Sequence, residues 1–135
     1  MKSKPTIIRE CDKWPELWMG VDKDVPYGQG IVKIMIPFIE SLVAEKVSDR
    51  VLNKHLNNLW LLGGEIIRNV SLCEEYNKIS PAQKLLDSIG SNEGPLCRHL
   101  YTEAAQRSFD STCGKLYNFL IKNKKPVATS KVKRT

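Results

Sequence analysis

The chain has 135 residues, of which 41% are hydrophobic and 27% are charged. This length and composition predict one globular domain that buries enough apolar surface to fold by itself. No apolar run is long enough to span a bilayer and no secretory segment follows Met1, so we expect a cytoplasmic protein that is neither membrane-embedded, secreted nor disordered as a whole.

The positive charge of the chain is concentrated at its C-terminal end. Six of the 21 basic residues and none of the 15 acidic residues lie between Lys122 and Thr135, so this segment carries the whole net charge of +6. Because its charges repel one another and it lacks apolar periodicity, residues 122–135 are predicted to form a disordered tail. The tail is suited to salt-sensitive contacts with phosphates, and the alternative is a solubilising end or a linker.

The N-terminal end is rich in residues that interrupt secondary structure. Pro15, Pro26 and several glycines predict an irregular arm over residues 1–29. Trp14 and Trp18 lie within it, and we expect their indole rings to pin the arm onto a helical core. The alternative is that the Trp14/Trp18 arm binds a protein partner.

Two long helices are predicted next. In the first, from about Gly30 to Lys46, apolar residues recur at steps of three and four, and Pro37 predicts a kink or a division into two short helices. The second begins after Ser48, whose hydroxyl can cap the free amides of the first turn, and continues to about Val70. The pair Gly63-Gly64 lowers its helix propensity and is expected to let another helix pack closely.

Two further helices complete the predicted core domain, residues 30–121. Ser80 is expected to cap one of them and Pro81 to occupy its first position, while Gly90 is expected to end it in the left-handed conformation. The last helix starts near Thr102 and runs to about Asn123. Strand signals are nearly absent, so the fold class is predicted to be all-α, a single small bundle of four to five helices.

The sequence contains no motif of a known catalytic or metal site. The four cysteines are widely spaced without a CxxC pair, which favours buried reduced thiols over zinc ligands. Of the two histidines, His55 lies on the apolar side of the second helix, where a hydrogen-bonded core imidazole is expected, and His99 lies beside a loop. We therefore predict no enzymatic activity, cofactor, metal or small-molecule substrate.

The exposed side of the second helix is the candidate functional surface. Four residues recur there at steps of three and four with no acid among them: Arg50, Asn53, Lys54 and Asn57. Arginine and lysine bind phosphates or guanine edges, and asparagine can pair with adenine through two hydrogen bonds. The alternative interpretation is a solvated polar face without a partner.

The order of residues from Phe38 to Leu59 resembles the start of the core-binding domain of tyrosine recombinases and phage integrases. The resemblance lies in Phe38 and Leu42 on the first helix and, after it, in the sequence Val47-Ser48, His55 and Leu59. It departs from the family at Lys46, where glycine is usual, and at Val51, where a threonine near phosphate is usual. The match covers about a quarter of the chain.

This resemblance implies a domain of four to five helices that holds one side of a DNA duplex, without the separate catalytic domain of the family. We therefore predict a non-catalytic domain that binds double-stranded DNA through the four residues of the second helix together with three lysines at the C-terminal end, Lys122, Lys124 and Lys125. The alternative is a helical protein–protein interaction module with no nucleic-acid role. The neutral charge of residues 1–121 predicts modest affinity for DNA.

Overall fold

The computed structural model describes residues 4–19, 24–72, 78–91, 93–95 and 100–123. In these ranges it contains five helices of eight residues or more and one of five residues: α1 (Lys4–Cys11), α2 (Trp14–Trp18), α3 (Val25–Ala44), α4 (Asp49–Leu72), α5 (Pro81–Ser88) and α6 (Glu103–Asn123). The β-type pairing found in the same ranges is an isolated bridge between Gly90 and Glu93. The predicted all-α fold is confirmed.

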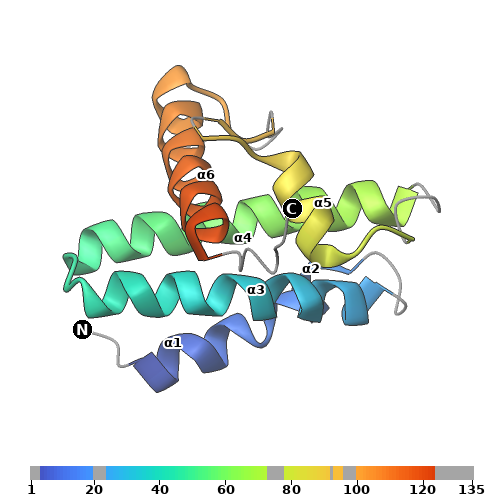
Figure 1. Cartoon of the computed structure of the whole chain (residues 1–135), viewed down its shortest axis with the longest axis horizontal. Coiled ribbons are helices and arrows are strands. Elements are labelled where there is room, and N and C mark those ends of the chain that lie inside the picture. The colour runs from blue at the N-terminus through green and yellow to red at the C-terminus, as the bar shows by residue number, and fades with distance from the viewer. Residues whose placement is uncertain (1–3, 20–23, 73–77, 92, 96–99, 124–135) are drawn as a thin grey trace, which may run out of the picture.

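The long helices α3 and α4 form a hairpin on which the other helices pack. They lie side by side along the long axis of the molecule, and α6 rises steeply from them (Figure 1). The short helix α1 lies along α3, while α5 packs on α3 and α4 toward the end of the hairpin away from the connecting turn (Figure 1). This arrangement leaves α4 with α1 and α2 on one side and α6 on the other.

The turn between α3 and α4 is set by two local features. Ser48 caps α4 as predicted, since its Oγ accepts a hydrogen bond from the amide of Val51 at 3.1 Å. Lys46 has a φ of +58°, the left-handed conformation that favours glycine. The backbone here therefore adopts a geometry that glycine would satisfy with less strain than lysine.

Pro37 does not divide α3 into two helices. The helix runs from Val25 to Ala44 as one element with Pro37 inside it. The side chains of Pro37 and of Lys33, whose carbonyl loses its amide partner, both lie on the exposed side of α3. Water can therefore hydrate that carbonyl, which lowers the cost of interrupting the hydrogen-bond ladder.

The prediction of an irregular arm over residues 1–29 is wrong for most of its length. Lys4–Cys11 and Trp14–Trp18 are helical, and α3 begins at Val25. Pro15 and Pro26 lie in the first turns of α2 and α3, where the missing amide hydrogen of proline has no cost. These prolines therefore start helices rather than prevent them.

The same N-terminal residues belong to the core. Ile7 and Cys11 of α1 are each 1% exposed and join the hydrophobic cluster formed by α3, α4, α5 and α6. The predicted domain boundary at residue 30 falls inside α3, so the folded unit extends to the N-terminal side of that boundary. At the other predicted boundary, Lys122 is the last residue but one of α6, and residues 124–135 lie outside the described part of the chain.

Gly63 lets α2 pack directly on α4, as the glycine pair predicted. A Cβ atom at Gly63 would overlap the six-membered ring of Trp18, whereas one at Gly64 would lie 3.5 Å from the same indole, an ordinary contact distance. The Nε1 of Trp18 donates a hydrogen bond to the backbone oxygen of Trp60 at 3.0 Å. The indole ring is thus held close against the backbone of α4.

The cap predicted for the start of α5 is confirmed, and α6 begins with a cap of the same kind. Ser80 accepts a hydrogen bond from the amide of Gln83 at 3.2 Å, and Thr102 accepts one from the amide of Ala105 at 3.0 Å. Gly90 does not adopt the predicted left-handed conformation, because α5 ends earlier in an extended residue, Ile89. The amide of Gly90 instead donates to the backbone oxygen of Glu93 at 2.8 Å.

Two of the four cysteines, Cys11 and Cys113, are buried as expected, while Cys73 and Cys97 lie outside the described residues. None of the described helices combines the length and the hydropathy that crossing a bilayer requires.

Candidate nucleic-acid interface

The four predicted residues of α4 are all exposed, but the structure divides them between two neighbourhoods. Lys54 lies on the side of α4 toward α6, where it is close enough to His55 to affect its ionisation. Asn53 and Asn57 lie on the side toward α1 and line a hollow between α1, α2 and α4. Arg50 is exposed in the first turn of α4, between these two sides.

The side toward α6 is built on a buried polar contact. His55 is 1% exposed, and its Nδ1 shares a hydrogen bond with Oγ1 of Thr112 in α6 at 2.7 Å. The Nδ2 of Asn58, a residue that is 7% exposed, donates to the same Oγ1 at 2.9 Å and to the backbone oxygen of Ser108 at 3.1 Å. These bonds satisfy polar groups that would be costly to bury alone, and they fix how α6 crosses α4.

His55 is therefore the hydrogen-bonded core imidazole that the sequence predicted. Burial, with smaller contributions from the positive charges of Lys54 and Lys115, lowers the pKa of His55 to about 4. The imidazole is neutral at pH 7. Lys54 of α4 and Lys115 of α6 therefore both carry an exposed positive charge close to the contact between these helices.

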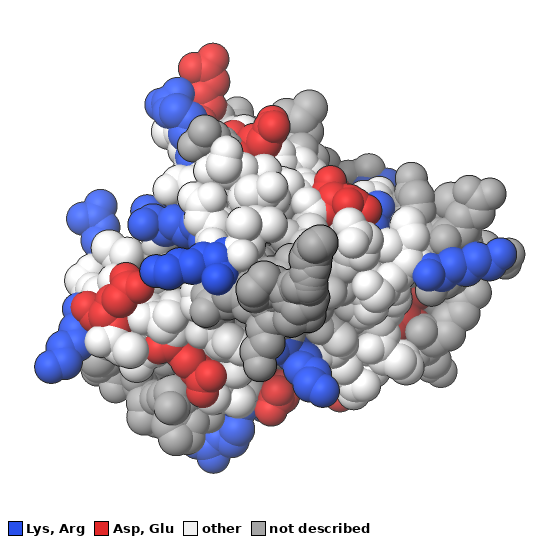
Figure 2. Space-filling view, in the orientation of Figure 1, with Lys and Arg blue, Asp and Glu red and all other residues white. Residues whose placement is uncertain are grey.

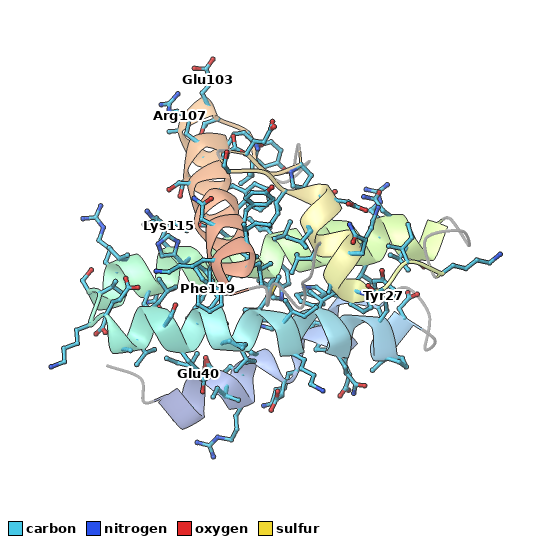
Figure 3. The ribbon with its side chains drawn as sticks, viewed as in Figure 1. Tyr27, Glu40, Glu103, Arg107, Lys115 and Phe119 are labelled. Atoms are coloured by element: carbon cyan, nitrogen blue, oxygen red, sulfur yellow. The ribbon has the colours of Figure 1, made fainter. Side chains whose placement is uncertain are left out.

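Lys115 belongs to a polar face of α6 that contains no acidic residue. This face is formed by exposed side chains at steps of three and four residues, namely Ser111, Lys115, Asn118 and Lys122. In Figure 3, Lys115 projects from the side of α6 that faces the N-terminal half of α4, and Arg107 lies at the far end of the helix beside Glu103. Arg107 forms an ion pair with Glu103 at 3.6 Å, so its charge is largely compensated.

The charge distribution on the surface agrees with a local basic patch rather than a basic molecule. Figure 2 shows several Lys and Arg side chains over the N-terminal half of α4 and the adjoining side of α6. Acidic side chains lie next to them, near the connection between α3 and α4 (Figure 2). We call Arg50, Lys54, Lys115 and Lys122 the basic patch.

The hollow on the other side of α4 brings together residues that are distant in the sequence. Its volume is about 270 Å³, and its polar lining consists of Glu10 from α1 with Asn53 and Asn57 from α4. Trp14 of α2 and Trp60 of α4 also line it. The two asparagines thus face a carboxylate and two indoles rather than the lysines of the basic patch.

Trp14 and Trp18 pack within the molecule. Their ring centroids are 5.7 Å apart, and both side chains are half-buried against the hydrophobic core. This packing matches the expectation that the two indoles pin the N-terminal segment, and it adds no support to a partner surface built on them. Of the other predicted site residues, Lys124 and Lys125 lie outside the described residues, as does His99.

Sequence reasoning missed Lys115 of the basic patch and missed Glu10 and Trp60 of the hollow, and as a binding residue it connected Trp14 only with a protein partner. The acid-free spacing from Ser111 to Lys122 could have identified Lys115, since it is the pattern that identified the face of α4. No sequence signal could have joined Glu10 and Trp14 to Trp60, because their proximity depends on how α1 and α2 pack on α4. Among the described residues, no group of three or more His, Cys, Asp and Glu is arranged to hold a metal ion.

Comparisons of the chain with models of protein families, with curated proteins and with solved structures return no match.

Proposed function

We propose that this protein binds double-stranded DNA through phosphate contacts made by the basic patch. The observation that carries the proposal is the contact between His55 of α4 and Thr112 of α6, because the exposed Lys54 adjoins the first residue and the exposed Lys115 lies one helical turn after the second. Arg50 extends the cationic surface at the start of α4, and Lys122 extends it at the end of α6, both with exposed side chains. Clustered cations on one surface bind the phosphate backbone and supply most of the affinity that does not depend on sequence.

The position of the asparagines favours binding with little sequence preference. Reading adenine edges requires amide groups that enter the major groove beside the phosphate contacts. Asn53 and Asn57 instead line the hollow with Glu10, whose carboxylate repels phosphate. We therefore assign phosphate binding to the basic patch and assign no base reading in the duplex to these two residues.

The left-handed conformation of Lys46 supports the resemblance to recombinase core-binding domains. The family's usual glycine and this lysine stand at the same point of the helix–turn–helix, and the φ of +58° is the conformation for which glycine is suited. A turn that favours glycine at this point supports the proposed resemblance, although the residue itself is a lysine.

The test is DNA binding by the double variant Lys54→Gln/Lys115→Gln, measured by fluorescence anisotropy with a labelled duplex over a range of salt concentrations. Each lost phosphate contact lowers the slope of log K against log salt by about 1, so we expect a reduction of about 2 and weaker binding at low salt. The matched control is Lys13→Gln/Lys33→Gln, which removes the same charge from exposed positions outside the patch. Equal binding by the two double variants would contradict the proposal.

A further inference from the structure

The hollow between α1, α2 and α4 combines apolar, aromatic and polar side chains from three helices. Ile7 and Cys11 at its base are each 1% exposed and give it an apolar floor. Trp14 and the partly exposed Trp60 supply aromatic walls from two different helices. The volume of about 270 Å³ lies just below the range usual for drug-sized ligands, so the hollow has room for one small ring system.

The polar groups at the hollow select the chemistry of the ligand. Asn53 and Asn57 each offer an amide that donates and accepts hydrogen bonds, whereas the carboxylate of Glu10 only accepts. None of the described residues that line the hollow is a lysine, arginine or histidine. Phosphate and carboxylate groups are therefore disfavoured inside it, and a planar ring that carries both N–H donors and ring-nitrogen acceptors is favoured.

We propose that the hollow binds a nucleobase with an exocyclic amino group, adenine above all. An asparagine amide pairs with the amino group and the adjacent ring nitrogen of adenine through two hydrogen bonds. The indole side chains of Trp14 and Trp60 line the hollow, and aromatic side chains of this kind stack on nucleobases. The volume suits a single base and is too small for a dinucleotide cofactor.

Arg50 places a cation just outside the hollow. It precedes Asn53 by about one helical turn on the exposed strip of α4, so it can approach a phosphate attached to a base that occupies the hollow. The base can belong to a free nucleotide or to a single strand of nucleic acid. Binding of a base within a single strand rests on the proposed nucleic-acid function, whereas binding of a free nucleotide does not.

The experiment is calorimetric titration of the full chain with adenosine, AMP and single-stranded oligo(dA), with thymidine and oligo(dT) as the comparison ligands. We expect the adenine compounds to bind and to quench tryptophan fluorescence, and the thymine compounds to bind at least roughly tenfold more weakly. Asn57→Ala should lower the affinity for adenine compounds roughly tenfold or more. The matched control is Asn118→Ala, which removes an exposed amide from α6 and should leave this affinity unchanged.

The outcomes separate the two sources of the base and the two proposals. Binding of adenosine or AMP identifies a free nucleotide as a sufficient ligand, and binding of oligo(dA) alone identifies a strand. The inference is overturned if no adenine compound binds, if thymine compounds bind equally well, or if Asn57→Ala binds like the wild type. If adenine compounds do not bind but the protein still binds duplex DNA through the basic patch, only the nucleobase inference is overturned. If adenine compounds bind but Lys54→Gln/Lys115→Gln binds duplex DNA as well as its control does, only the proposed DNA-binding function is overturned.

Discussion

The two sides of α4 use similar residues for different purposes. Toward α6, His55 and Asn58 are buried and their polar atoms are bonded to Thr112 and Ser108. Toward α1 and α2, Asn53 and Asn57 are exposed beside a hollow, and the close packing is made by Trp18 on Gly63. The difference teaches that a polar residue on a helix serves stability where a neighbouring helix covers it, and is available for a ligand where the neighbouring helices leave a gap.

The largest expected effect tests the packing on the α2 side. In Gly63→Ala the new methyl group would overlap the ring of Trp18, which the hydrogen bond to Trp60 holds in place, so we expect a loss of about 1–3 kcal/mol in the free energy of unfolding. Gly64→Ala is the matched control, since its methyl group meets the indole at ordinary distance and alanine favours the helix by up to about 1 kcal/mol. Urea unfolding measures both. Equal stability of the two variants would show that Trp18 does not pack on Gly63.

The second prediction compares two neighbouring amides on opposite sides of α4. Asn58→Ala removes the donor to Ser108 and Thr112 from a buried contact, so we expect it to lower the free energy of unfolding by about 2 kcal/mol. Asn57→Ala should change it by less than about 0.5 kcal/mol, because its side chain is exposed. Thermal unfolding of both variants is the measurement. If Asn57→Ala lowers the free energy of unfolding as much as Asn58→Ala does, the two sides of α4 do not differ in the way described.

A smaller effect is expected from pH. The pKa of His55 falls from 6.5 in the unfolded chain to about 4 in the fold, so the unfolded state binds more protons between these values. The contribution of the neutral imidazole is complete above pH 6.5 and is lost as the pH falls toward 4. We expect the unfolding free energy to be about 1–2 kcal/mol lower at pH 5 than at pH 7.

The control for this pH effect is His55→Gln, which keeps a polar side chain in the contact but cannot titrate. Its unfolding free energy should fall less between pH 7 and pH 5 than that of the wild type. If both proteins lose the same amount, carboxylates elsewhere cause the dependence and the buried imidazole does not.

Much of the helical architecture could be predicted from local sequence features. Ser48 and Ser80 cap the helices that they were expected to cap, because a cap bonds to amides only a few residues away, and the last helix begins near Thr102 as expected. The buried stripe of α4, with Leu52, Leu59 and Leu62, also follows from helical spacing alone. The N-terminal helices were missed because segments as short as α1 and α2 depend on tertiary packing for their stability.

Local sequence features predict only part of the candidate sites. The sequence by itself determined that Arg50, Asn53, Lys54 and Asn57 share an exposed strip of one helix, since periodicity places residues around a cylinder. The tertiary structure alone decided that Lys54 and Lys115 both lie near the buried His55 at the contact between α4 and α6, and that Asn53 and Asn57 line a hollow with Glu10 and two tryptophans. The physical reason is that caps and helical faces arise from contacts within a few residues, whereas the neighbours of a face depend on how helices distant in the chain bury their apolar sides together.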